Sequence, residues 1–416
     1  MNNQLPKDWK WVKLGEVCHT TSGGTPSRRE IKYYKGNIPW VKSGELDKGL
    51  ITDTEEKISE EAVKNSSAKV FPKGTLLIAL YGATIGKLAF LGVDAATNQA
   101  ICGIYQNESI SSKFLYNYLF YKKQKLVNQG IGGAQPNISQ TILKNLDLPL
   151  PPKEAQQLIV SKIEELFSEV DKGNEELKTA QQQLKVYRQA VLKWAFEGKL
   201  TNENVKEGEL REGWRQTKLG DYIRKIEAGK SFKCDERPPK ENEVGVLKVS
   251  AVTWGEFDDE ESKTVIDNSK VNANYFINVG DFLFSRANTI ELVGASVIVK
   301  HLRKKVMLSD KTLRIVFTDG VNKFYVLYYL RCKKGRNEIE RLSTGNQESM
   351  RNIGQERIKQ ISIPYCSLEE QQQIVQEIES RLSVCDKIEE TITNSLKQAE
   401  ALRQSILKKA FEGKLI

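Results

Sequence analysis

Two short motifs resemble sites for nucleotide or nuclease chemistry. The segment Gly82–Lys87 (GATIGK) has the glycines and lysine of a phosphate-binding loop. However, only three residues separate its glycines, and Leu88 stands where Ser or Thr would hold magnesium. Glu55–Lys57 and Glu261–Lys263 carry the Glu-x-Lys triplet of nuclease centres, but no Pro-Asp accompanies either. We expect no nucleotide binding at the first motif and interpret the triplets as solvated surface.

The residues that most often perform acid–base or metal chemistry are scarce. His19 and His301 are the two histidines, and none of the six cysteines forms a C-x-x-C pair. Neither a His-based metal cluster nor a disulfide framework is expected, and the cysteines are interpreted as reduced, mostly buried thiols. The chain also lacks a G-x-G-x-x-G loop and an Asn-Pro-Pro-Tyr motif. These features predict a non-catalytic chain with no metal or cofactor of its own.

Length and composition limit the class of protein. A chain of 416 residues is too long for one ordinary core and suits two or three domains. Hydrophobic residues make up 39% and charged residues 28%, as in globular proteins. The formal net charge of +9 mildly favours an anionic partner. No apolar run approaches the roughly 18 residues of a membrane span, so a soluble, cytoplasmic protein without a membrane partner is expected.

The elements that must position any functional residues occur twice. Residues 154–201 align without a gap with residues 369–416, and about 22 of these 48 positions are identical. The preceding segments match more loosely, at offsets that rise from 205 to 215. The sequence therefore predicts two copies of one unit, each a variable module followed by a module of fixed length. The predicted segments are 1–151 (module 1), 152–200 (central helix), 201–365 (linker and module 2) and 366–416 (C-terminal helix).

The fixed modules have the periodicity of a coiled coil. Apolar residues recur at alternating steps of four and three, and a segment of about 43 residues would form a helix about 65 Å long. The first seam consists of Ile159, Ile163, Leu166, Val170, Gly173, Leu177, Ala180, Leu184, Tyr187 and Val191. A long helix with one apolar stripe needs a partner, and the other copy in the chain is the nearest. Two independent linkers or an intermolecular coiled coil are the alternatives.

The variable modules mix strand and helix signals. VFPKGTLLIAL, ATNQAICGIY and DKTLRIVF are typical of short apolar strands, and SSKFLYNYLFYKKQKLVNQG is typical of an amphipathic helix. Together with the repeat, these patterns predict an α+β fold. Two α/β modules are joined by two long helices, which pack against each other as an intramolecular coiled coil. Two polar modules with basic loops, held at a set separation, suit duplex DNA with two half-sites.

Several segments together resemble the specificity subunit of type I restriction–modification systems. They are TSGGTPSR (Thr21–Arg28), IPWVKSGEL (Ile38–Leu46), LYGATIGKLAFLGVDAATNQAIC (Leu80–Cys102), the segment Gly132–Val160 and the doubled FEGKL helix ends. In module 2, EAGKSFKC replaces TSGGTPSR and SRANTIELVG replaces LYGATIG. The resemblance covers essentially the whole chain, and the divergence makes residue transfer less secure in the second half.

The resemblance implies a function and a set of partners. Each module would be a target-recognition domain that reads one half of a bipartite, asymmetric site in double-stranded DNA. The two long helices would pack as an antiparallel coiled coil and set the gap between the halves. Two methyltransferase (M) subunits and motor-nuclease (R) subunits would assemble on the chain. Methylation and cleavage would reside in those partners, which would use S-adenosylmethionine, ATP and magnesium.

Candidate DNA-binding residues are polar side chains in the loops of both modules. Arg and Lys donate to guanine, Gln and Asn pair with adenine, and Ser or Thr can do either. Surface solubility or loop capping is an equally good interpretation of any single one. The candidates are Thr25, Ser27, Arg28, Arg29, Lys42, Ser43, Tyr81, Thr84, Lys87 and Gln135 in module 1, and Lys230, Ser231, Lys233, Lys248, Ser250, Arg286, Asn288, Asn346, Gln347 and Arg351 in module 2.

Two further interpretations stay open from the sequence. A non-enzymatic adaptor with two protein-binding heads on a helical spacer would have the same repeat and coiled coil. The basic residues near the helix ends either complement the helix dipole in solvent, or the shared FEGKL ends help to dock the methyltransferase subunits. These basic residues are Arg188, Lys193, Lys199, Arg403, Lys408 and Lys414.

Overall fold

The computed structural model describes residues 5–129, 137–202, 204–206, 209–347 and 350–416. The chain divides into two compact units. Unit 1 comprises Met1–Leu177 and Asn394–Ile416, and unit 2 comprises Lys178–Thr393. Each unit therefore holds one variable module, the start of one long helix and the end of the other.

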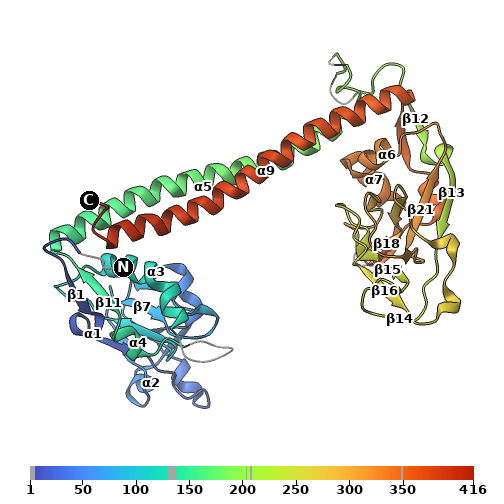
Figure 1. Cartoon of the computed structure of the whole chain (residues 1–416). Coiled ribbons are helices and arrows are strands. Elements are labelled where there is room, and N and C mark those ends of the chain that lie inside the picture. The colour runs from blue at the N-terminus through green and yellow to red at the C-terminus, as the bar shows by residue number, and fades with distance from the viewer. Residues whose placement is uncertain (1–4, 130–136, 203, 207–208, 348–349) are drawn as a thin grey trace. The chain divides into compact units, whose positions relative to one another are not determined.

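Module 1 contains a five-stranded sheet, a four-stranded sheet and a two-stranded ribbon (Figure 1). In sheet order, the five strands are β2 (Thr20–Ser22), β10 (Ile101–Ile104), β7 (Leu76–Ala79), β8 (Leu88–Leu91) and β4 (Leu50–Ile51). The four are β5 (Glu56–Ile58), β3 (Ile38–Val41), β9 (Ala95–Thr97) and β6 (Val70–Phe71), and the ribbon is β1 (Lys10–Lys13) with β11 (Asp147–Leu150). The helices are α1 (Leu14–Val17), α2 (Glu60–Lys64), α3 (Ser112–Asn128) and α4 (Gln140–Lys144).

Module 2 contains sheets of four, four and three strands and a matching ribbon. The first sheet is β13 (Ile223–Ala228), β21 (Thr312–Phe317), β17 (Phe282–Ser285) and β19 (Ser296–Ile298), and the second is β14 (Cys234–Asp235), β16 (Ser262–Val265), β15 (Gly245–Leu247) and β20 (Val306–Met307). The third is β18 (Ala287–Asn288), β23 (Met350–Asn352) and β22 (Thr344–Gln347), and the ribbon is β12 (Arg215–Lys218) with β24 (Ser362–Tyr365). The helices are α6 (Lys323–Arg331), α7 (Lys333–Leu342) and α8 (Gln355–Lys359).

The amphipathic helix predicted in module 1 is α3, and its sequence explains both its start and its buried face. The Ser111 hydroxyl accepts a hydrogen bond from the Phe114 backbone N–H at 3.5 Å and so caps the helix. Phe114, Tyr118 and Leu119 lie on its buried side. In module 2 the corresponding segment breaks at Cys332 into α6 and α7. The side chain of Cys332 then accepts from the Gly335 N–H and caps α7.

The two long helices are α5 (Lys153–Ala195) and α9 (Leu368–Phe411), with 43 and 44 residues. They begin near the predicted boundaries 152 and 366. Gly198 (φ +84°) and Gly413 (φ +67°) follow their ends in the left-handed region, where glycine carries no Cβ penalty.

The helices pack against each other in antiparallel order. In unit 1, Arg403 forms an ion pair with Asp171 and lies 4.7 Å from the ring centre of Phe167. In unit 2, Arg188 lies 2.7 Å from Asp386 and 2.9 Å from Glu389. The partners Arg188–Asp386 and Arg403–Asp171 exchange places under the 215-residue repeat, so the same bridge forms once in each unit. The predicted fold class is confirmed.

Each hydrophobic core combines a module with both helices. In unit 1, Ile159 and Ile163 of α5 and Leu407 of α9 join the cluster that contains Phe114 of α3. In unit 2, the matching positions of the two helices pack around α6 in the same way. The start of one helix and the end of the other are thus both anchored in the same module.

Candidate nucleic-acid interface

The candidate loops of module 1 leave its sheets at one edge. β10 pairs antiparallel with both β2 and β7, and β7 pairs antiparallel with β8. The ends of β2 and β7 therefore lie beside the starts of β8 and β10. β3 of the neighbouring sheet reaches the same edge, because the Asn98 backbone N–H donates to the Val41 carbonyl at 3.0 Å. We call this the loop edge of module 1.

Module 2 has an equivalent loop edge. β21 pairs antiparallel with β13 and β17, so the start of β21 lies beside the ends of β13 and β17. β15 runs parallel to β20, which places the loop at Lys248 beside the segment that follows Met307. β18 directly follows β17 and pairs with β23, which adds Arg351 to the same region. The topology thus brings together candidates that are up to about 120 residues apart in sequence.

Arg28 of module 1 is held by a carboxylate and two rings. Its guanidinium donates to Glu56 at 2.6 Å and 3.3 Å and lies 4.2 Å and 5.1 Å from the ring centres of Tyr34 and Trp40. The Arg28 hydrogen bond holds the pKa of the Glu56 carboxyl below its ordinary value, and Lys42 acts in the same direction against burial. These contacts occupy the guanidinium N–H groups with which an Arg would donate hydrogen bonds to guanine.

Two other predicted cations of module 1 are also neutralised within the chain. The Lys42 ammonium lies 2.8 Å from Glu55 and 3.2 Å from Glu56, and Lys87 lies 2.5 Å from Asp47. Glu55 and Glu56 belong to the Glu-x-Lys triplet, so its acidic residues bind the cations of their own module. Each of these cations would have to exchange a carboxylate for a phosphate to bind DNA.

The remaining candidates of module 1 differ in setting. Ser27 and Arg29 are exposed in the loop after β2, and Arg29 forms no ion pair within the described residues. Ser43 begins a 3-10 turn after β3, and Thr84 ends another between β7 and β8. Gln135 lies outside the described residues.

A polar cluster at this edge joins the predicted residues Thr25 and Tyr81 to Gln99, which the sequence analysis did not identify. The Thr25 hydroxyl donates to the Gln99 side-chain carbonyl, and the half-buried Tyr81 hydroxyl also hydrogen-bonds Gln99. Burial raises the pKa of Tyr81 above its ordinary value. The neighbouring Asn98 has a buried side-chain oxygen without a hydrogen-bond partner in the described residues. The available signal was the polar pair Asn98–Gln99 just before an apolar strand.

In module 2, by contrast, the predicted lysines are free cations. Lys230, Lys233 and Lys248 form no ion pair with any residue that the structure describes, and Lys230 and Lys233 are exposed. Ser231 donates to the Asp310 carboxylate, and Ser250 donates to Glu261 at 2.5 Å. The two modules therefore present different charge to a ligand.

The two arginines of module 2 have different surroundings. The half-buried Arg286 has one long contact, 3.5 Å, to the Asn352 side chain. Arg351 instead donates to the Ser343 hydroxyl at 3.0 Å and to the Gly345 carbonyl at 2.8 Å, which fixes it within the β22–β23 hairpin. Arg286 is thus the better placed of the two to contact a ligand.

The remaining candidates of module 2 are the amides Asn288, Asn346 and Gln347. The Asn288 side chain accepts from the Thr289 N–H at 2.9 Å. Asn346 and Gln347 belong to β22, and their side chains lie outside the described residues.

Two buried glutamines position the modules on the helices. In unit 1, the Gln156 amide accepts from the Ser111 N–H at 2.7 Å and donates to the Pro151 carbonyl at 3.0 Å. In unit 2, Gln371 accepts from the Asn322 N–H at 2.8 Å and donates to the Cys366 carbonyl. Both side chains are fully buried. Their identity at the 215-residue offset was the signal that could have revealed them.

The FEGKL helix ends are anchored inside the chain by their phenylalanines. Phe411 packs edge-on against Phe114 and Tyr118 of α3, with centroid distances of 5.3 Å and 4.9 Å. Phe196 packs edge-on against two tyrosines of α6, both at 5.1 Å. These two rings are therefore buried by contacts within the chain.

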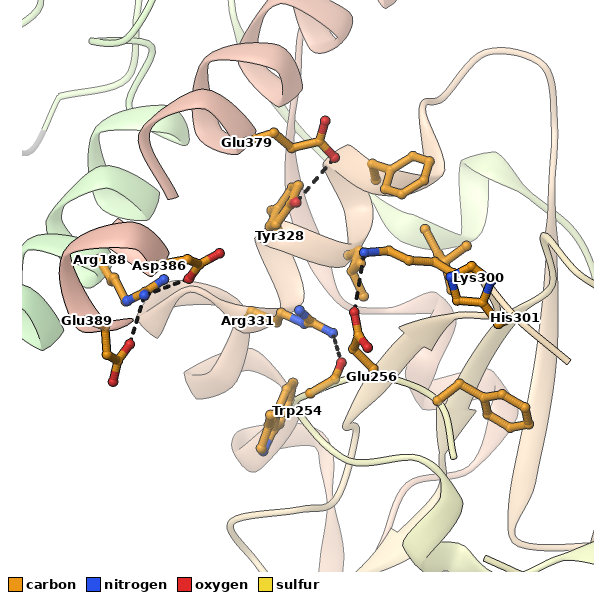
Figure 2. A pocket seen from close by; sticks show the side chains of 15 residues that line it. Arg188, Trp254, Glu256, Lys300, His301, Tyr328, Arg331, Glu379, Asp386 and Glu389 are labelled. Carbon is orange, nitrogen blue, oxygen red and sulfur yellow. Dashed lines mark hydrogen bonds and ion pairs between the residues drawn. The ribbon is translucent and has the colours of Figure 1, made fainter. Parts of the chain in front are cut away.

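A cavity of about 460 Å³ in unit 2 lies between α6, the loop at Trp254 and the two long helices (Figure 2). Its charges largely compensate one another: Arg188 bridges Asp386 and Glu389, and Lys300 lies 3.7 Å from Glu256. Burial lowers the pKa of the Arg331 guanidinium in this cavity. Four carboxylates at its wall make it unsuited to a polyanion.

Within the described part of the chain, no three His, Cys, Asp or Glu side chains gather as metal ligands. None of its helices is both long enough and apolar enough to cross a bilayer.

The chain is similar to one known protein family and to curated relatives over nearly its whole length. The family model of the type I restriction modification DNA specificity domain matches residues 6–182 and 211–398. The EcoKI specificity subunit of Escherichia coli K12 is 25% identical over 424 residues, which cover 99% of this chain and 90% of that protein. The EcoEI specificity subunit of Escherichia coli is 29% identical over 515 residues, 97% of this chain and 83% of that protein.

Solved structures share the fold. A chain from work on complex assembly and conformational transition of the type I R-M system has a TM-score of 0.73 at 21% identity and covers 99% of both chains. The HsdS subunit of Thermoanaerobacter tengcongensis has a TM-score of 0.61 at 22% identity, with 99% of this chain and 98% of that chain covered.

Proposed function

Because the chain belongs to the family of type I restriction modification DNA specificity domains, we propose that it is the DNA-sequence specificity subunit of such a system. Each module reads one half of a bipartite, asymmetric site in double-stranded DNA. The main observation that supports this is the pair of loop edges. They share one antiparallel core, β2-β10-β7-β8 in module 1 and β13-β21-β17-β19 in module 2, and carry different side chains. Two unlike reading surfaces on one repeated frame suit a site whose halves differ in sequence.

The contacts would divide between affinity and specificity. Free cations such as Lys230 and Lys233 neutralise phosphates, which gives affinity that depends on salt but not on sequence. Polar side chains at the loop edges, with Arg286, reach base edges and supply the discrimination. Among the candidate residues, module 1 has fewer cations without an ion pair, so its binding relies more on neutral hydrogen-bonding groups.

The chain is non-catalytic in this proposal. Methyl transfer and ATP-dependent cleavage are performed by methyltransferase and motor-nuclease subunits that assemble on it, and those subunits use S-adenosylmethionine, ATP and magnesium. The family supports this assignment. The anchored phenylalanines and buried glutamines are consistent with a rigid scaffold, since they hold each module on both helices.

We further propose that the helix pair sets the unspecified gap between the half-sites. A matched insertion of one heptad in α5 and one in α9 keeps the apolar seam in phase. It lengthens each helix by about 10 Å, which corresponds to roughly three base pairs of duplex. Selection of bound duplexes from a random pool would then recover a gap about three base pairs longer with both half-sites unchanged. Altered half-site letters, or an unchanged gap, would contradict the spacer role.

The proposal itself is tested with the unaltered full-length chain. Selection from a random duplex pool, at fixed salt, is expected to enrich two short sequence blocks separated by a fixed unspecified gap. The purified chain is also expected to transfer no methyl group and to hydrolyse no ATP. Enrichment of no sequence, or turnover by the pure chain, would refute the assignment.

A further inference from the structure

One polar pair occurs at the same place in both loop edges. In module 1, a Cβ at Gly23 would lie 2.2 Å from the Thr97 carbonyl oxygen, so the chain passes closely there because the residue is glycine. Thr25 lies two residues after Gly23, and Gln99 lies two residues after Thr97. The Thr25 hydroxyl donates to the Gln99 side chain. Gln99 lies two residues before β10.

Module 2 repeats this arrangement with different chemistry. A Cβ at Gly229 would lie 1.8 Å from the Leu308 carbonyl oxygen. Ser231 lies two residues after Gly229, and Asp310 lies two residues after Leu308. The Ser231 hydroxyl donates to the Asp310 carboxylate. Asp310 lies two residues before β21. The frame and the hydroxyl are thus retained, whereas a neutral amide in module 1 is replaced by a carboxylate in module 2.

The surroundings of Asp310 are cationic. Its exposed carboxylate forms no ion pair with any described residue. Exposed Lys311 is its neighbour in sequence. Exposed Lys230 follows Gly229, whose backbone N–H donates to the Ser309 carbonyl at 3.1 Å. The Arg286 backbone N–H donates to the Lys311 carbonyl at 2.9 Å, which brings Arg286 to the same point. An uncompensated carboxylate therefore lies within the group of free cations that would face DNA.

The physical consequence follows from the charge of DNA. A carboxylate on a DNA-facing surface is repelled by phosphates, and it forms favourable contacts only with hydrogen-bond donors. In the major groove the donors of the bases are exocyclic amino groups, the N4 amino of cytosine and the N6 amino of adenine. An Asp accepts from cytosine N4, whereas a Gln or Asn pairs with adenine through both its amide atoms.

Resting on the proposed function, we propose that Asp310 is a specificity-determining residue of module 2, which accepts a hydrogen bond from an exocyclic base amino group. Gln99 occupies the equivalent reading position in module 1. Ser231 and Thr25 are positioning residues, because each hydroxyl holds the reading side chain at the edge. The exchange of amide for carboxylate gives one repeated frame two different base preferences.

The experiment compares full-length variants in the selection from a random duplex pool. D310N is expected to lower the preference at one base pair of one half-site by about tenfold or more and to shift it toward adenine, while the other half-site stays unchanged. Q99E should change one base pair of the other half-site. The matched control is D319N, because Asp319 is an exposed carboxylate near the opposite end of β21. It should leave every position unaltered.

The outcomes distinguish this inference from the proposed function. If the unaltered chain enriches a bipartite site and D310N enriches the same site with equal discrimination, the reading role of Asp310 is refuted. A uniform change in affinity for all sequences would likewise refute it. If the unaltered chain enriches no site, the proposed function fails. S231A keeps the carboxylate and is expected to weaken discrimination at the same base pair, and a change elsewhere would contradict the positioning role.

Discussion

The anchoring of the C-terminal helix end on module 1 leads to a prediction about Phe411. Its ring is 4% exposed and lies 4.9 Å from Tyr118, 5.3 Å from Phe114 and 5.7 Å from Tyr121. Replacing Phe411 with Ala removes a buried ring and leaves a cavity between α9 and α3. Such truncations cost about 3–5 kcal/mol, which corresponds to a roughly 10²–10⁴-fold larger population of the undocked helix end.

The assay must report on each unit separately, because unfolding of a chain with two units is not one two-state transition. Hydrogen exchange of backbone amides in α3 and in the last turns of α9 should accelerate in F411A, and exchange in α6 should not change. F196A should give the converse result, since Phe196 packs on Tyr325 and Tyr329 of α6. V186A is the control, because Val186 is 70% exposed on α5.

Two results would refute this reasoning. A loss below about 1 kcal/mol in F411A would mean that the ring contributes no more than an exposed apolar residue. Equal acceleration of exchange in α3 and α6 would mean that the helix ends do not anchor the modules individually.

Two further predictions concern Glu56 in module 1 and Gln371 in unit 2. Glu56 has a lowered pKa, so it stabilises module 1 above about pH 4.5, and this contribution is lost as the pH falls through the lower folded value. E56Q should therefore flatten the acid-induced decline in the melting temperature of module 1, whereas E60Q at an exposed glutamate should not; parallel curves for E56Q and the unaltered chain would contradict the assignment. Q371A leaves a buried backbone donor unpaired and should destabilise unit 2 by about 1–3 kcal/mol, measured by denaturant unfolding against Q372A at the exposed neighbour; equal stability of the two variants would show that water replaces the amide.

The sequence predicted the architecture well because its signals are local or repeated. The seam of α5 and α9 can be seen from apolar spacing. The strands and α3 follow from apolar runs and from an amphipathic pattern. The break at Cys332 was not predicted, because α6 and α7 together have the composition of one helix.

The reading surface was harder to predict because charge pairing is a property of tertiary contacts. Arg28, Lys42 and Lys87 have the residue types that read or bind DNA, but each faces a carboxylate of its own module. Lys230 has the same type and no such partner. The candidate DNA contacts therefore remain a prediction, which the structure narrows toward the free cations and the polar pairs.

The sequence alone determined that this chain is a doubled unit with two long helices, since periodicity and repetition are written in residue order. Only the tertiary structure decided which polar groups meet. Gln99 and Thr25 are 74 residues apart, and Asp310 and Ser231 are 79 residues apart. Strand pairing brings each pair to one sheet edge. No local spacing encodes such a contact, because it depends on which strands become neighbours when the core is buried.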